Sequence, residues 1–143
     1  MRGPAALGLT AAAVLLLAAC GGPSPDLFVV ERTGSVPGAR LTLVVDDGGF
    51  VRCNGGKRLQ ISSEQLIDAR EIERALSGEE EKPGPAAKDL VLPPREGSVL
   101  RYDVRTEAGS VSFADTSANQ PPDLFRLAKL TRTLAKQVCG LPR

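Results

Sequence analysis

Three cysteines constrain this chain of 143 residues more than any other feature of its sequence. Cys20 directly follows an apolar N-terminal run, whereas Cys53 and Cys139 are separated by about 86 residues. If two of the cysteines pair in an exported protein, the third thiol needs another use. Which cysteine is left over decides the compartment of the protein and which distant segments must meet in its fold.

The N-terminal residues have the layout of an export signal. Arg2 supplies a positive charge, and residues 5–19 form an apolar run that only Gly8 and Thr10 interrupt. This run is shorter than the roughly 20 apolar residues that a membrane-spanning helix needs. The sequence therefore predicts a cleavable signal peptide over residues 1–19.

The end of that signal, Leu17-Ala18-Ala19-Cys20, resembles the lipobox of bacterial lipoproteins. In that family the cysteine thiol is acylated with diacylglycerol, and the signal is then cut just before the cysteine. The resemblance implies that Cys20 is lipidated, that residues 20–25 form a short tether, and that the membrane is a partner through the lipid. The protein would then be anchored at the outer face of the cytoplasmic membrane, since two acyl chains are enough for stable anchoring. The alternative is an ordinary secretory signal with a stray cysteine.

The two remaining cysteines make an even pair in an oxidising compartment, where a disulfide between Cys53 and Cys139 is expected. Closing so long a loop would stabilise the folded state by about 4–5 kcal/mol on chain-entropy grounds. A redox pair or a metal site is the alternative. Neither cysteine belongs to a CxxC motif, however, and the chain contains no histidine.

The composition of the rest of the chain bounds its fold and its partners. Residues 26–143 have the length of one domain. Four phenylalanines, one tyrosine and no tryptophan leave the core to Leu, Val and Ile. Without Arg2, 17 basic residues face 17 acidic residues. This balance lacks the positive excess that favours nucleic-acid binding, so no nucleic-acid partner is expected.

Alternation of apolar and polar residues predicts an antiparallel sheet of about five strands. The motif Asp46-Asp47-Gly48-Gly49 predicts a hairpin turn, because Asp and Gly tolerate positive φ. The clearest alternation is LRYDVR, in which Leu100, Tyr102 and Val104 share one face. The expected strands cover residues 27–32, 40–46, 50–53, 99–105 and 110–114.

Two helices are expected to pack on this sheet. Ser62 and Gln65 have the spacing of a capping box, and Gly78 marks the end of the first helix, whose apolar stripe includes Ile67. The second helix covers residues 123–139, and Phe125 widens its apolar face. The resulting order, βββ-α-ββ-α, predicts an α+β domain.

Residues 79–98 interrupt the pattern with four prolines and three consecutive glutamates, which predicts an exposed loop. Leu90, Val91 and Leu92 form an apolar patch in this loop and are a candidate protein-binding surface. The alternative is a loose connector that contains a short docking segment.

A second candidate surface is the basic face of the C-terminal helix, formed by Arg126, Lys129, Arg132 and Lys136. These cations could rest on anionic lipid headgroups. The alternative is a solvated helix face.

The sequence predicts no enzyme. Without histidine there is no conventional Ser-His-Asp or Cys-His catalysis, and no phosphate-binding loop or zinc spacing is present. Asp46 and Asp47 could form a carboxylate pair for acid–base chemistry or calcium, but the glycines beside them favour a turn. We therefore expect no catalytic residue, no metal and no cofactor.

The region after the tether is similar to small actinobacterial-type lipoproteins that have no assigned activity. It also resembles emfourin, a protein inhibitor of thermolysin-like metalloproteases, in its order of elements, its LRYDVR strand and its PPDLFRLAKLTRTL helix. The two cysteines and the insertion at 79–98 depart from that family. We expect a non-catalytic module that binds an envelope protein. The alternatives are an emfourin-like inhibitor and a carrier of a small apolar ligand.

Overall fold

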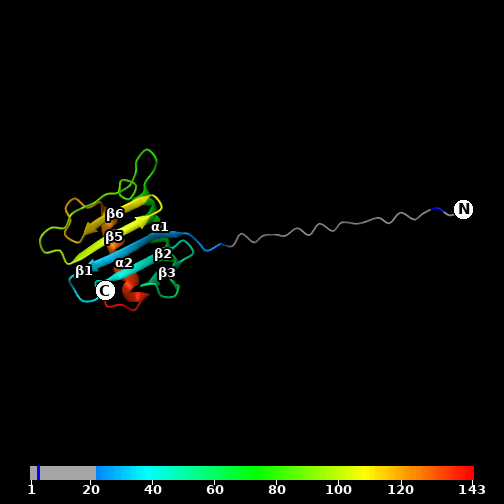
Figure 1. Ribbon diagram of the computed structural model, residues 1–143, viewed down its shortest axis with the longest axis horizontal. Coiled ribbons are helices and arrows are strands. Elements are labelled where there is room, and N and C mark those ends of the chain that lie inside the picture. Colours follow the sequence, from blue (N-terminus) through cyan, green and yellow to red (C-terminus); the bar gives the residue numbers. More distant parts are fainter. Residues whose placement is uncertain (1–2, 4–21) are drawn as a thin grey trace.

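The computed structural model describes Gly3 and residues 22–143, so Cys20 and the lipobox lie outside the described residues. The described residues form one antiparallel sheet and two helices (Figure 1). The elements are β1 (Asp26–Gly34), β2 (Leu41–Asp46), β3 (Phe50–Cys53), β4 (Leu59–Gln60), α1 (Ser63–Ser77), β5 (Leu100–Thr106), β6 (Gly109–Ala114) and α2 (Pro122–Gln137). This arrangement confirms the predicted α+β class.

The sheet has six strands in the order β4-β3-β2-β1-β5-β6, one strand more than the sequence predicted. The extra strand is β4, which pairs with β3 through Phe50 opposite Gln60 and Val51 opposite Leu59. Two residues are too few to show an alternating pattern, so β4 is recognisable only from its neighbour. β1 lies between β2 and β5, where Arg32 is opposite Leu41 on one side and Tyr102 on the other.

Both helices cover the same face of the sheet and lie behind the strands in Figure 1. The buried side chains of the sheet and of the helices form one hydrophobic cluster. The opposite face carries no helix among the described elements and bears charged pairs such as Glu31 with Arg105. The largest apolar members of the core are Phe28, Phe113, Leu41, Leu43, Ile72, Leu76, Leu124, Leu127 and Leu134.

The predicted helix signals are present at α1. The Ser62 side chain accepts a hydrogen bond from the Gln65 N–H, and the Gln65 side chain accepts one from the Ser62 N–H, which completes the capping box. Gly78 ends the helix, and its N–H donates to the Arg74 carbonyl. α2 begins at Pro122 and ends at Gln137, two residues before the predicted end.

Two hydrophobic residues that the sequence placed in the apolar helix faces are exposed. Ile67 of α1 is 56% exposed and Phe125 of α2 is 59% exposed. At 100° per residue, Ile67 lies about 200° around its helix from buried Ala69, and Phe125 lies about 100° from buried Leu124. Their side chains therefore point away from the sheet. The apolar stripes predicted for the two helices were too wide, because they included these two exposed residues.

The predicted disulfide is present and joins Cys53, at the end of β3, to Cys139, just after α2. The two Cα atoms lie 6.0 Å apart. Because α2 starts after β6 at one edge of the sheet and ends beside β3, this bond ties the helical layer to the other half of the sheet.

The segment 79–98 is bonded to its neighbours along its length. Ala86 is buried and donates to the Leu76 carbonyl at 2.9 Å. Further on, the Leu92 N–H donates to Ser112 of β6, and the Ser112 N–H donates to Leu90, at 2.8 and 2.9 Å. The segment thus covers the outer edge of β6, which would otherwise expose unpaired backbone groups. The segment is therefore not a loose connector, and Leu90 and Leu92 are the part of it that docks on β6.

Candidate binding surface

The apolar patch predicted at Leu90, Val91 and Leu92 is smaller than expected. Val91 forms a parallel bridge with Ser112, and successive side chains of an extended segment point to opposite sides. Leu90 and Leu92 therefore turn inward and pack against the core, while Val91 is 63% exposed. Val91 is thus the one exposed side chain of this candidate surface, while Leu90 and Leu92 are partly buried.

The basic face of α2 divides into two parts. Lys129, Arg132 and Lys136 are exposed, and Phe125 lies on the same side of the helix. At 100° per residue these four side chains lie within about 60° of one another. We call them the α2 stripe. Within the described part of the chain, none of its three cations forms an ion pair.

Arg126, the fourth predicted cation, belongs to the contact between the helices. Its guanidinium donates to Asp68 at 2.7 Å and to Glu71 at 2.9 Å, both on α1, and lies 3.4 Å from Asp123. Hydrogen bonds to Asp68 and then to Glu71 raise the pKa of Arg126. Arg126 is thus separated from the stripe, because three carboxylates already neutralise it.

A groove of about 600 Å³ runs between α1 and α2 beside the stripe. Its α1 wall carries Glu64, Asp68 and Glu71, and Lys129 lies on its α2 wall. The two walls of this groove therefore differ in charge, with acidic side chains on the α1 wall and Arg126 and Lys129 on the α2 wall.

The two candidate surfaces do not merge. Leu90 lines a different hollow, of about 940 Å³, together with Pro121 and Asp123 at the start of α2. No member of the α2 stripe lines that hollow. The loop patch and the stripe therefore occupy separate parts of the surface.

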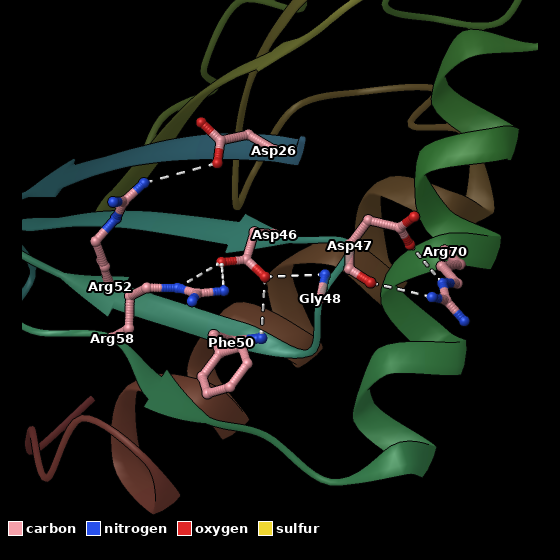
Figure 2. A network of polar contacts seen from close by, with 8 residues as sticks. All are labelled: Asp26, Asp46, Asp47, Gly48, Phe50, Arg52, Arg58 and Arg70. Atoms are coloured by element: carbon pink, nitrogen blue, oxygen red, sulfur yellow. Dashed lines mark hydrogen bonds and ion pairs between the residues drawn. The ribbon is translucent and has the colours of Figure 1, made fainter. Parts of the chain in front are cut away.

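Asp46 and Asp47, the candidate carboxylate pair, point to different partners (Figure 2). Asp46 is buried and accepts hydrogen bonds from the N–H groups of Gly48 and Phe50 at 3.0 and 3.3 Å. Arg58 donates two more to it, at 3.1 and 2.8 Å, while its guanidinium stacks 4.0 Å from the centre of the Phe50 ring.

Asp47 turns the other way and bonds Arg70 of α1, with 2.6 Å between Oδ1 and Nε. The hairpin turn that the sequence predicted accounts for the bonds of Asp46 to Gly48 and Phe50, whereas Arg58 reaches Asp46 from beyond β3. Among residues 22–143, no three His, Cys, Asp or Glu side chains gather closely enough to hold a metal ion.

The structure also shows a buried cation that the sequence analysis missed. Arg32 is 1% exposed, and its guanidinium donates to the backbone oxygens of Ala39, Gly38 and Arg143 at 2.8, 3.2 and 3.0 Å. Burial lowers the pKa of Arg32, and neighbouring Tyr102 opposes that shift. The period of two along β1 places Arg32 on the inward face with Phe28 and Val30 and could have identified it.

Comparison with known proteins gives no match to a protein-family model, a curated protein or a solved structure. No helix within the described residues is both long and apolar enough to span a membrane.

Proposed function

We propose that this chain is a lipoprotein, anchored through Cys20 at the outer face of the cytoplasmic membrane, whose domain binds a protein of the cell envelope. The observation that carries the anchor is the use of the cysteines. Cys53 and Cys139 bond to each other, which leaves Cys20, the last residue of the lipobox-like motif, as the odd thiol.

The binding role draws its support from the arrangement of the domain. One face of the sheet packs against both helices, while the other carries exposed charged side chains, including Glu31 and Arg105. An antiparallel sheet with one solvated face leaves a broad, stable surface for a partner. The exposed Val91 at the edge of the sheet adds an apolar contact point.

Replacing the lipid acceptor tests the anchor. In cells, Cys20→Ser should move the protein from the membrane fraction to the soluble extracytoplasmic fraction, because the thioether can no longer form. Cys53→Ser leaves the proposed acceptor intact and should keep the protein on the membrane, so it serves as a control. Membrane association of Cys20→Ser equal to that of the unmodified sequence would contradict the anchor.

Crosslinking from defined positions tests the partner. A photoreactive amino acid at Val91, or at Glu31 on the open sheet face, should capture one envelope protein in intact cells. The same group at buried Leu43 is the control and should capture none. Capture of a thermolysin-like metalloprotease would favour the emfourin-like alternative, and absence of any captured protein from both exposed positions would contradict protein binding.

A further inference from the structure

We propose that the α2 stripe is a docking surface for an anionic phospholipid bilayer. This inference deepens the proposed function, because it rests on the lipid anchor to hold the domain near the bilayer. It names the headgroups of anionic phospholipids as the partner of this face and gives the domain an orientation.

The charge of the stripe is complementary to that of an anionic surface. The cations of the stripe have no ionic partner among residues 22–143, although the described residues contain seven ion pairs. The nearby acids Asp68, Glu71 and Asp123 all lie against Arg126. A chain with balanced total charge therefore keeps three cations on one strip of one helix, and no carboxylate among residues 22–143 pairs with them.

The shape of the stripe also suits a flat bilayer surface. From Phe125 to Lys136 the helix rises about 16 Å, so the four side chains form a narrow and nearly straight line. Such a line can contact several headgroups at once. Phe125, which is 59% exposed at one end of that line, offers an apolar group that can enter the headgroup region beside the cations.

The lipid anchor would strengthen the contact of the stripe with the bilayer, and the acidic side chains of α1 would set its direction. Three cations attract an anionic surface weakly, and each is worth about a fivefold change in binding at low salt. The tether of residues 20–25 would keep the stripe close to the bilayer, so a weak contact becomes effectively intramolecular. The acidic side chains Glu64 and Glu71 across the groove would be repelled, so α2 should face the lipid while α1 tilts away.

The chain contains no tryptophan, which makes a clean reporter possible. The lipidated protein with Phe125→Trp is placed in vesicles of phosphatidylcholine, with or without about one-third phosphatidylglycerol. We expect a blue shift of the emission, and quenching by brominated lipids, in the anionic vesicles. Both effects should disappear as salt rises from about 0.05 M to about 0.5 M. Ile67→Trp, exposed on the acidic helix, should show a clearly smaller response.

A charge variant tests the role of the cations. In the Phe125→Trp background, replacing Lys129, Arg132 and Lys136 by Gln should abolish the response to anionic vesicles. The matched control replaces three exposed cations outside the stripe, Arg40, Lys57 and Lys88, by Gln. This variant should keep the response to anionic vesicles. An equal response in neutral vesicles, or an unchanged response after removal of the stripe cations, would overturn the proposal. The proposal would also be overturned if a polyglutamate peptide produced the blue shift of the emission and anionic vesicles did not. The stripe would then recognise an acidic protein.

The inference and the proposed function can fail separately. Mass spectrometry of the peptide that contains Cys20 shows whether cells acylate that residue. If they do not, a thiol-reactive phospholipid can be coupled to Cys20, since the other two cysteines are in a disulfide. The emission measurements then still decide whether α2 docks on the bilayer.

Discussion

Arg32 is the largest fully buried side chain in the described part of the protein, and it carries a charge. Backbone oxygens, and not an acidic side chain, accept its hydrogen bonds. Two of these oxygens belong to the connection between β1 and β2, and the third belongs to Arg143. Tyr102 lies opposite Arg32 in the sheet and stacks on Phe113, with 4.8 Å between the ring centres. Within this buried cluster, Tyr102 is the group from which a pH dependence of stability is expected.

Tyr102 should make the protein less stable in alkaline solution. Burial raises the pKa of its phenol above the ordinary value of 10.0, and the charges of Arg32 and Arg132 oppose this shift. Above pH 10 the unfolded chain therefore loses the phenol proton while the folded chain keeps it, so the free energy of unfolding falls as pH rises. Tyr102→Phe should remove this part of the pH dependence in urea unfolding between about pH 9 and about pH 11.

An independent measurement of the same group is available, because Tyr102 is the only tyrosine in the chain. Its phenolate absorbance should appear at higher pH in the folded protein than in urea. Coincident titration curves for the folded and unfolded protein would contradict the expected shift.

Asp46 and Asp47 are adjacent, yet their removal should have unequal effects. Asp46→Ala leaves the Gly48 and Phe50 N–H groups and Arg58 without their acceptor, and should lower the free energy of unfolding by about 2–3 kcal/mol. Asp47→Ala loses one half-exposed ion pair and should cost less than about 1 kcal/mol. Urea denaturation of both variants measures this difference, and equal losses would show that the contacts of Asp46 do not stabilise the turn.

At the scale of single elements, the end of α1 depends on one glycine. Gly78 has φ +72° and ψ −161°, a backbone conformation that is essentially restricted to glycine. A Cβ there would also collide with the backbone of Gly84, where the segment 79–98 turns back along the helix. The helix and the segment that covers β6 are therefore joined at a position that accepts no side chain.

Gly78→Ala should lower the free energy of unfolding by about 1–3 kcal/mol because of the strained backbone. Any displacement of the segment 79–98 would add to this loss. Gly97→Ala is a matched control, since Gly97 also has positive φ, +81°, but a Cβ there would lie in open space. We expect a smaller loss for the control, about 1 kcal/mol. Thermal unfolding compares the two, and a larger loss at Gly97 would contradict the role of crowding at Gly78.

At the scale of the whole molecule, the disulfide joins the end of β3 to the segment just after α2, and the two are far apart in the sequence. Cys53→Ser and Cys139→Ser should each lower the free energy of unfolding by about 4–5 kcal/mol, because either change releases the long closed loop. The double variant should lose no more than either single variant. Chemical denaturation of all three variants tests this cycle, and additive losses would mean that the cysteines stabilise the fold independently.

Signals contained within a few residues of sequence predicted much of this fold. The capping box of Ser62 with Gln65 and the turn at Asp46 to Gly49 each have their contacts nearby in the chain. The alternation through Tyr102 is equally local, because the side chains of a strand alternate whatever its neighbours are. Of the candidate surfaces, the exposed cations Lys129, Arg132 and Lys136 could be located because helical spacing alone separates them from the buried face.

The sequence by itself thus determined the α+β class and the main strands and helices, and the place of Cys20 in the lipobox-like motif left Cys53 and Cys139 as the expected disulfide. Only the tertiary structure decided that β4 exists, that Leu90 and Leu92 cover the edge of β6, and that Arg126 is neutralised by α1. The physical reason is the distance along the chain between partners. These contacts join residues whose meeting depends on the order of strands in the sheet and on how the helices cross it, and no local periodicity encodes that order.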